Sequence, residues 1–373
     1  MHKSIYENLE SITKDDHIKI KVENLDRNFF LDDESVGHSH KSFGVAWTPV
    51  EGAKSYALCF TDYEASGVMG VPFVHWYCLN IKQPFLKFDS SNNTPGLIEG
   101  ENTASCHFTH PIVNLSNNLR YGKGYFAPCP PNKTHKYEIK IYALMNELEG
   151  YDQDQKLYLT EFEKIIDQLG VITDGVLYVN CPRLTFNENR LMQKHNTMHT
   201  EPLIMKKTCG TYYMIEDLLI TDLKLNYYDE IDLNYLKIHK NCHFKVVDNN
   251  RRAKAYAILI TSNHLYEKYG APFIHYARIF NKKDYSKNIP FLNTYGLRPD
   301  LTHFQQDYYR HLIYEFCILA DPLYNEKNTY TINVYAIDRD VTEIRETKDK
   351  SPSGMFDIIS GHVIGFISKR VKL

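Results

Sequence analysis

The sequence predicts a mainly β protein built from two tandem copies of one unit. The first observation is a repeat, because GVPFVH at residues 70–75 returns as GAPFIH at residues 270–275. The second is that the repeated stretches have the composition and the turn-bounded length of β-strands. The third is that amphipathic helical periodicity is found in few places along the chain.

The repeat extends well beyond these six residues. At an offset of 200, AKSYALCFTD (53–62) aligns with AKAYAILITS (253–262). At an offset of 193, APCPPNKTHKYEIKIYAL (127–144) aligns with ADPLYNEKNTYTINVYAI (320–337). The blocks keep their order and nearly their spacing, as duplicated units do. We therefore expect two domains, residues 1–185 and 186–373, joined through the polar, aperiodic stretch 182–202.

The strands are expected over SYALCFTD (55–62), FVHWYCLNI (73–81) and KYEIKIYAL (136–144), and over AYAILITS (255–262) in the second unit. KYEIKIYAL alternates polar and apolar residues, which predicts a half-buried strand. LTEFEKIIDQLG (159–170) predicts a short amphipathic helix with Thr160 as its cap and Gly170 as its stop. SPSGMFDIISGHV (351–363) is the expected counterpart of this helix in the second unit.

Composition and charge narrow the function classes. The formal net charge is −3, so no basic excess favours binding to nucleic acid. The eight cysteines form no C-x-x-C pair, which fits unpaired thiols in a reducing compartment. No run of about 18 apolar residues predicts a transmembrane helix. With a polar N-terminal stretch, these features predict a cytoplasmic protein.

Four polar residues of the first unit lie at or near the ends of predicted strands. Asp62 ends one strand, His75 lies just inside another, and His135 and Tyr137 share one face of a third. If these strands are neighbours, the four groups converge on an anion-sized polar pocket. The carboxylate would orient one imidazole and favour its charged form. The protonated rings and the tyrosine hydroxyl would then donate hydrogen bonds to an oxyanion.

Each of these residues also has a structural interpretation. A histidine on a strand is often a packed core residue, and a strand-end aspartate is often a turn residue. Glu64 is interpreted as a solvated loop charge or as part of the pocket. Cys129 lies beside His135 but between prolines, and Pro128 and its neighbours suit a stiff wall better than an activated thiol. CHFTH (106–110) lacks a second ligand pair, so no metal site or cofactor is expected.

Taken as an ordered set, four stretches of the first unit are specific. They are TDYEAS (61–66), HWYCLNI (75–81), GYFAPCPPNKTHKY (124–137) and YAL (142–144). The set resembles the phosphatidylethanolamine-binding protein family, and within it the bacterial Raf-kinase-inhibitor-like (YbhB/YbcL-type) branch. WTPVEGAKSYAL (47–58) and SGHVIG (360–365) also resemble the family's text. The resemblance covers residues 40–180 well and residues 243–373 weakly.

The resemblance implies a β-sandwich with a small surface pocket for phosphate-like anions. By position, Asp62, His75, His135 and Tyr137 match that pocket, Glu64 and Tyr125 lie on its rim, and Pro128 and Cys129 lie in its wall. Two departures are visible. Two rim prolines are replaced at Tyr63 and Ser66, and two glycines are replaced at Phe126 and Ala127. The loss of the glycines is expected to narrow the mouth or to change which backbone N–H groups face the ligand.

The second unit departs further from the family. Only His275 and Tyr330 keep the identities of their counterparts, whereas Ser262 replaces the carboxylate and Asn328 replaces the second imidazole. We expect this pocket to be inactive and His275 to be a packed structural residue, and the alternative is a pocket of altered specificity. Members of the bacterial branch resemble small homodimers, so the two halves are expected to pack as an internal pseudo-dimer with a pseudo-two-fold interface.

Three function classes remain open at this point. The favoured one is a non-enzymatic module that binds phosphate or a phosphorylated headgroup or peptide in the first unit. A hydrolase or transferase using the His/Asp pair is the second, although no G-x-S-x-G elbow, P-loop or metal motif accompanies the pair. A regulator or scaffold that binds a protein partner is the third, and it rests on the resemblance to animal kinase inhibitors.

Overall fold

The protein is seen in a computed structural model. The structure describes residues 5–6, 11, 18–37, 39–66, 72–105, 122–130, 133–152, 155–183, 218–221, 245–248, 252–263, 266, 271–282, 329–340, 352–359 and 362–372. The expected linker and the segment CHFTH (106–110) lie largely or wholly outside these residues.

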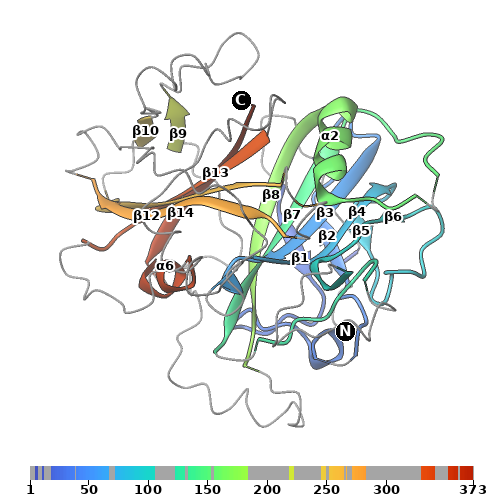
Figure 1. The fold of residues 1–373 in the computed structure, drawn as a ribbon, viewed down its shortest axis with the longest axis horizontal. Helices are drawn as coiled ribbons and strands as arrows, with labels where there is room; N and C mark the ends of the chain where they lie inside the picture. Colours follow the sequence, from blue (N-terminus) through green and yellow to red (C-terminus); the bar gives the residue numbers. More distant parts are fainter. Residues whose placement is uncertain are drawn as a thin grey trace, which may run out of the picture.

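The first unit is built on an antiparallel five-stranded sheet of order β6-β4-β3-β7-β8 (Figure 1). Its strands are β3 (Ser55–Asp62), β4 (Phe73–Ile81), β6 (Ile98–Glu99), β7 (His135–Leu144) and β8 (Val171–Cys181). A smaller sheet of order β1-β2-β5 consists of β1 (Ile20–Val22), β2 (Val45–Trp47) and β5 (Phe85–Leu86). The strands expected at 55–62, 73–81 and 136–144 are confirmed, the last beginning one residue earlier.

A second antiparallel sheet, of order β12-β11-β13-β14, lies beside the first. Its strands are β11 (Ala255–Ser262), β12 (Phe273–Asn281), β13 (Thr329–Ile337) and β14 (Val363–Lys372). The strand order repeats that of β4-β3-β7-β8. The irregularities repeat as well, since the register shifts between Phe60 and Thr61 and again between Ile260 and Thr261. A separate two-stranded sheet pairs β9 (Leu218–Thr221) with β10 (Lys245–Asp248).

Two α-helices and two short 3-10 helices accompany the described strands. They are α2 (Leu159–Leu169), α6 (Pro352–Ile359), η1 (Asp33–Ser35) and η2 (Thr103–Ser105). Both α-helices were expected, and Gly170 ends α2 with a positive φ of 79° that favours glycine. The prediction that Thr160 caps α2 is wrong. Tyr158 occupies the N-cap position without a side-chain hydrogen bond, and the Thr160 hydroxyl instead donates to the carbonyl of Asn263.

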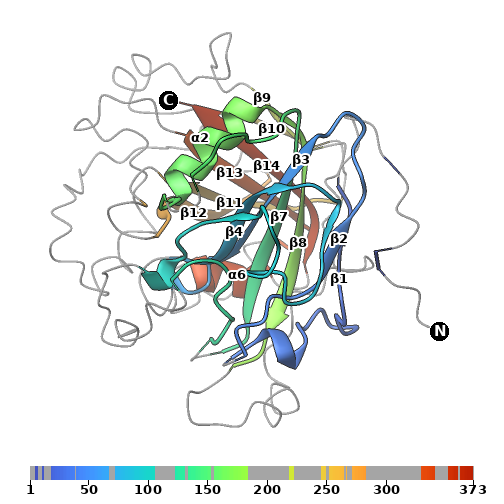
Figure 2. The same cartoon turned by 90° about the vertical axis from the view of Figure 1, so that its right-hand side faces the viewer.

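The five-stranded sheet is the middle layer of the molecule (Figure 2). Its inner face packs on the small sheet in a core rich in aromatic rings, which includes Trp47, Phe60, Trp76 and Tyr137. Its outer face is covered partly by α2, whose Phe162 lies against Tyr77 and Tyr142, and partly by the second sheet. We find no edge-to-edge pairing between the two large sheets among the described strands, so they meet through side chains.

Strand β7 differs from its predicted half-buried state, because every one of its residues is buried. The alternating polar side chains lie on the outer face, where the second sheet covers them. Lys140 Nζ lies 3.2 Å from Asp174 Oδ2 and donates to the Ser368 hydroxyl at 2.8 Å. A charged group taken out of water is tolerated when it is paired in this way. The half-buried prediction is therefore wrong because the polar face is covered by the other half of the chain.

A second polar chain crosses the same interface. The Tyr178 hydroxyl donates to the Glu138 carboxylate, and the hydroxyls of Tyr178 and Tyr335 lie 2.6 Å apart. Burial raises the pKa of the Glu138 carboxyl, because the low-dielectric surroundings disfavour its charge. The rings of Tyr335, Phe356 and Phe366 pack around Tyr178. The interface thus combines apolar packing with matched buried polar groups.

Arg370 of β14 joins the second sheet to α2. Its guanidinium lies 2.9 Å from Asp167 Oδ1, donates to the carbonyl of Glu163, and lies over the ring of Tyr142 at 6.0 Å. Both Arg370 and Asp167 are largely buried, so this pair is shielded from solvent more than an ordinary surface ion pair.

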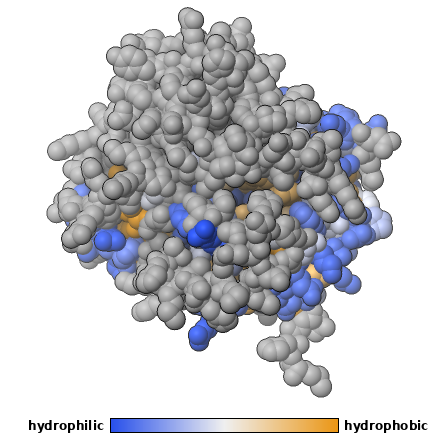
Figure 3. Space-filling model, turned by 60° about the horizontal axis from the view of Figure 1, so that its bottom comes forward, coloured by the Kyte–Doolittle hydropathy of each residue, from blue (hydrophilic) through white to orange (hydrophobic). Residues whose placement is uncertain are grey.

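The described part of the surface is mostly polar. Met145 is the one large hydrophobic residue among the described residues that is exposed, at 50%. On the face seen in Figure 3, apolar colour occurs only as small areas among hydrophilic ones. Within the described residues, no helix is both long and apolar enough to cross a membrane.

The contacts of Arg370 predict a measurable effect on stability. Arg370→Ala removes the ion pair and leaves Asp167 and the Glu163 carbonyl without this partner, so we expect a loss of about 2 kcal/mol in the free energy of unfolding. Lys82→Ala is the matched control. Its partner Glu147 is 41% exposed, and its loss is expected to cost less than about 1 kcal/mol. Urea denaturation measures both, and equal effects would contradict the importance given to the Arg370 contacts.

Candidate functional site

The inner face of the five-stranded sheet carries the four predicted pocket residues. Strands β4, β3 and β7 are neighbours in the sheet, as their expected convergence requires. Asp62 ends β3, His75 lies near the start of β4, and His135 and Tyr137 lie at the start of β7. All four are at least 96% buried. The site is thus formed where the ends of three adjacent strands meet.

A β-bulge positions His75. Trp76 and Val74 both have partners on β3, whereas the shift in register leaves His75 without one. A bulge of this kind redirects a side chain. Trp76 belongs to the inner core, and the His75 ring also lies on the inner side, 5.6 Å from the Phe60 ring and 5.2 Å from the Tyr137 ring.

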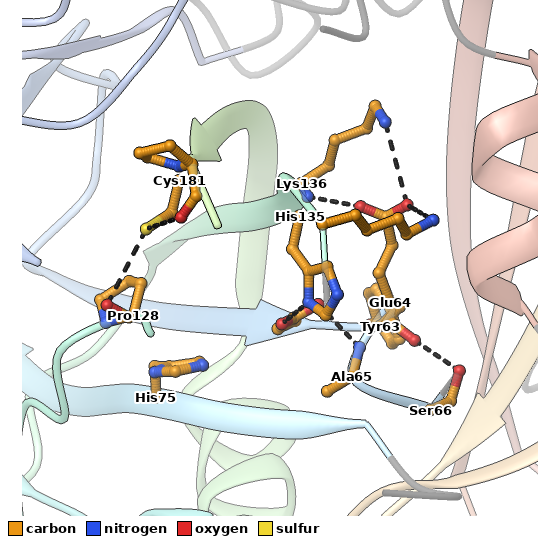
Figure 4. A network of polar contacts seen from close by, with 12 residues as sticks. Tyr63, Glu64, Ala65, Ser66, His75, Pro128, His135, Lys136 and Cys181 are labelled. Atoms are coloured by element: carbon orange, nitrogen blue, oxygen red, sulfur yellow. Dashed lines mark hydrogen bonds and ion pairs between the residues drawn. The ribbon is translucent and has the colours of Figure 1, made fainter. Parts of the chain in front are cut away.

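Asp62 orients His135. Asp62 Oδ2 lies 2.7 Å from His135 Nδ1, and Asp62 Oδ1 accepts the N–H of Ala65 at 3.0 Å (Figure 4). The expectation that the carboxylate orients one imidazole is confirmed. The Ser66 hydroxyl donates to the Tyr63 carbonyl at 2.7 Å. Side-chain hydrogen bonds therefore hold the turn where the resemblance led us to expect prolines.

His75 is held by the main chain of Phe126. His75 Nδ1 lies 2.8 Å from the Phe126 carbonyl oxygen, and the Phe126 N–H donates to the His75 carbonyl at 2.8 Å. A carbonyl can only accept, so Nδ1 carries the proton and the neutral ring has its lone pair on Nε2. Burial lowers the pKa of His75 to about 4. The expectation of a protonated ring at this position is wrong, because burial outweighs the nearby Asp62 charge.

Tyr137 supplies a buried hydroxyl. Its side chain is 0% exposed, and its Oη makes no hydrogen bond of normal geometry with the described residues, although the Asp62 carboxylate lies near it. Burial, with a smaller contribution from the Asp62 charge, raises the pKa of Tyr137 well above its ordinary value, so the hydroxyl keeps its proton. Buried polar groups in folded proteins are nearly always hydrogen-bonded. This unsatisfied O–H therefore indicates a position for a ligand or water oxygen.

Glu64 is completely buried, so its interpretation as a solvated loop charge is wrong, whereas its place on the rim of the pocket stays a prediction. Its Oε2 accepts the N–H of Lys136 at 2.6 Å, and its Oε1 lies 3.2 Å from Lys133 Nζ and 3.8 Å from Lys136 Nζ. Its carboxylate is committed to these lysines, and the charged run KTHK (133–136) was the signal in the sequence for such partners.

The expected rim residue Tyr125 and the expected wall residues Pro128 and Cys129 pack against the core or are anchored by the main chain. Tyr125 is buried among aromatic rings, and its hydroxyl donates to the Ser35 carbonyl, so this hydroxyl is already used. The Pro128 carbonyl accepts the N–H of Gly37 at 2.8 Å. Cys129 is partly buried and packs against the inner core. These three residues therefore make packing and main-chain contacts, whereas Asp62, His75, His135 and Tyr137 bring polar side-chain groups together.

Sequence reasoning missed how the wall is anchored. The buried Glu99 carboxylate accepts Trp76 Nε1–H at 2.6 Å and the Ser91 hydroxyl at 2.7 Å, and the Ser91 oxygen accepts the N–H of Tyr125 at 2.9 Å. This chain of bonds fixes the segment that carries Phe126. The bonds made by Phe126 use only main-chain atoms, so its residue type gave no signal.

The second sheet repeats part of this arrangement. Ser262 and Tyr330 are buried cross-strand neighbours, and His275 lies in β12 at the repeated bulge. Asn328 lies outside the described residues, as does the side chain of His275. Loss of anion binding here stays a prediction. Within the described part of the chain, no three His, Cys, Asp or Glu side chains are grouped so that they would hold a metal ion.

The burial of His75 predicts a pH dependence of stability. Because its pKa is about 4 in the folded protein and about 6.5 in the unfolded chain, the unfolded state binds more protons between these values. Stability is therefore lost as pH falls from 6.5 to 4, by about 3 kcal/mol for this group.

His75→Asn should lack this component, although it is less stable overall because the ring packing is lost. The measurement is urea denaturation of both proteins from pH 7 to pH 4. Parallel stability curves for the two proteins would show that His75 does not titrate as described.

Comparisons with known proteins agree with the motifs. A family model for phosphatidylethanolamine-binding proteins matches residues 11–177. The Bacillus subtilis protein YxkA is 32% identical over 116 residues, which are 30% of this chain and 66% of that protein. A UPF0098 protein of Archaeoglobus fulgidus is 31% identical over 123 residues, which are 33% of this chain and 37% of that protein. The aligned part thus spans just under two thirds of the first relative and little more than a third of the second.

Solved structures of similar proteins include the phosphatidylethanolamine-binding protein homologue CT736 of Chlamydia trachomatis, at 18% identity and a TM-score of 0.35, with 46% of this chain and 99% of that one covered. They also include YbcL of Escherichia coli, at 19% identity and a TM-score of 0.34, with 45% of this chain and 98% of that one covered.

Together with the family model and the curated relatives, the ordered motifs identify the first unit of this chain as a member of the phosphatidylethanolamine-binding protein family.

Proposed function

We propose that the first unit binds a small phosphate-like anion at the ends of β3, β4 and β7, and that it does so without catalysing a reaction. The observation that carries the proposal is the Tyr137 hydroxyl, which is fully buried and has no partner among the described residues. Leaving such a donor unsatisfied costs about 1–3 kcal/mol, and a ligand oxygen would recover this loss.

The neighbours of Tyr137 support the proposal. The His75 ring lies 5.2 Å from the Tyr137 ring, and the His135 ring lies 6.5 Å from it. Asp62 fixes His135, and the Phe126 main chain fixes His75, so neither ring has to be reordered when a ligand arrives. Preorganisation of this kind increases affinity because less conformational freedom is lost on binding.

The proposal predicts that binding depends on the first site and not on its repeat. Inorganic phosphate at about pH 6 should bind to the unmodified protein, and His75→Asn or Tyr137→Phe should weaken binding by about tenfold, the worth of one hydrogen bond at a desolvated site. His275→Asn is the matched control, since it alters the equivalent bulge in β12, and its affinity is expected to be unchanged. Isothermal titration calorimetry measures all four proteins.

Two results would contradict the proposal. One is the absence of phosphate binding to the unmodified protein. The other is turnover of phosphate or carboxyl esters that His75→Asn abolishes, which would favour the hydrolase or transferase.

We also propose that the second unit is a structural partner, related to the first by an approximate two-fold axis. Within the sheets, Val179 is the cross-strand partner of Tyr137, and Val371 is that of Tyr330. Positions 178 and 370 each come one residue before these partners, so they occupy equivalent places in the two units.

Residues 142 and 335 are equivalent through the repeat. Tyr178 contacts Tyr335, and Arg370 contacts Tyr142, so each contact has its reciprocal. Reciprocal contacts are what a two-fold interface between two copies produces.

Co-expression of residues 1–185 and 186–373 as separate chains tests this role. We expect a one-to-one complex, because the interface buries matched polar groups and apolar surface that neither half can cover alone. Two halves that stay monomeric and have no affinity for each other would contradict a structural partnership.

A further inference from the structure

We infer that the site selects an anion that still carries a proton, a small phosphate monoester in its singly charged form, over phosphodiesters and sulfate esters. This inference rests on the proposed function, since it names the ligand class of the same site. It follows from the direction of the hydrogen bonds that the site has to offer.

Tyr137 and His75 offer a ligand one donor and one acceptor. Tyr137 Oη is a donor without a partner among the described residues. His75 is the acceptor, because the Phe126 carbonyl fixes the proton on Nδ1 and leaves the Nε2 lone pair on the opposite side of the ring. Burial that lowers the pKa of His75 to about 4 keeps it an acceptor near neutral pH. A ligand that fits both groups needs one bare oxygen and one O–H.

The charges around His75 favour the same ligand. Both oxygens of the Asp62 carboxylate already accept hydrogen bonds, one from His135 and one from the Ala65 N–H, so Asp62 has no need of a ligand proton. Its negative charge remains close and disfavours a second negative charge on the ligand. Five titratable residues surround His75 and the Phe126 main chain that bonds to it. They are Asp62 from β3, His135 and Tyr137 from β7, Cys129, and His40, whose ring lies against that of Phe126.

Phosphate monoesters meet these requirements and their close analogues do not. The second pKa of a phosphate monoester is about 6, so the singly charged form, with one O–H, is abundant at weakly acidic pH. A phosphodiester, the linkage in a phospholipid headgroup, carries one negative charge and no O–H. A sulfate monoester has the same charge and shape as the monoester monoanion, also without an O–H. The proton is therefore the one difference that the site would recognise.

The test compares methyl phosphate, methyl sulfate and dimethyl phosphate by calorimetry on the whole protein at about pH 6. Methyl phosphate is expected to bind at least about tenfold more tightly than either analogue. Neither analogue has an O–H, so His75 would have to take up a proton from solution before it could form a hydrogen bond with one of them. Phosphoethanolamine and glycerophosphoethanolamine repeat the comparison with a free and a lipid-type headgroup. Equal affinity for the esters with and without the O–H would overturn the inference while leaving the proposed anion site in place.

Two variants of one residue form the matched pair. In His75→Gln the side-chain amide places a permanent donor near the position of Nε2, so the preference for methyl phosphate should fall to within about twofold. His75→Asn keeps a donor for the Phe126 carbonyl and removes Nε2, so all three ligands should bind weakly. An unchanged preference in His75→Gln would overturn the inference.

A measurement on the unmodified protein guards against variants that fail to fold. Titrations in two buffers of different ionisation enthalpy give the number of protons exchanged on binding. About one proton should be taken up per methyl phosphate at about pH 7.5 and almost none at about pH 5. No uptake at the higher pH would overturn the inference, and no binding of any ligand at either pH would overturn it together with the proposed function.

Discussion

Burial of the five-stranded sheet on both of its faces is the constraint on which the rest of the structure depends. An unmatched polar side chain on either face of such a sheet is costly, because an unpaired buried group costs more than a hydrogen bond contributes. On the outer face, Lys140, Glu138 and Tyr178 are matched by one another, by Asp174 and by groups of the second sheet. Among the described side chains of the inner core, Trp47 Nε1 and the hydroxyl of Tyr137 have no hydrogen-bond partner. Of these two donors, the Tyr137 hydroxyl belongs to the ring that lies beside His75 and His135, which gives it its functional interest.

The same constraint explains how the site is preorganised. An exposed pocket could rely on water to complete its hydrogen bonds, whereas this one uses the protein itself. The bulge at His75, the Asp62 turn and the main chain of Phe126 fix the two imidazole rings, and the Phe126 carbonyl sets the tautomer of His75. Burial then keeps His75 neutral and Tyr137 protonated, so the first side chain can accept a hydrogen bond and the second can donate one. The chemistry of the site therefore depends on the burial of these groups as much as on their residue types.

Strand positions, and the convergence of Asp62, His75, His135 and Tyr137 at neighbouring strand ends, could be predicted from the sequence because both follow from local pattern. SYALCFTD and FVHWYCLNI are strands to the residue, and the repeat placed matching strands in the second unit. The environment of these residues could not be predicted, because it depends on which surfaces meet. The alternation of KYEIKIYAL indicated a solvated face, and only the second sheet shows that this face is covered. Glu64 was misjudged for the same reason, since its lysine partners are brought to it by folding. Phe126 holds His75 through its main-chain atoms, which carry no sequence signal.

The central claim is that the groups at the ends of β3, β4 and β7 form one working anion site. The measurement that tests it most directly is nuclear magnetic resonance of the histidine side chains while phosphate is added at about pH 6. The account predicts that the His75 and His135 signals shift together and saturate, while those of His275 and His362 stay in place. Signals of His75 and His135 that do not respond to phosphate would contradict the account.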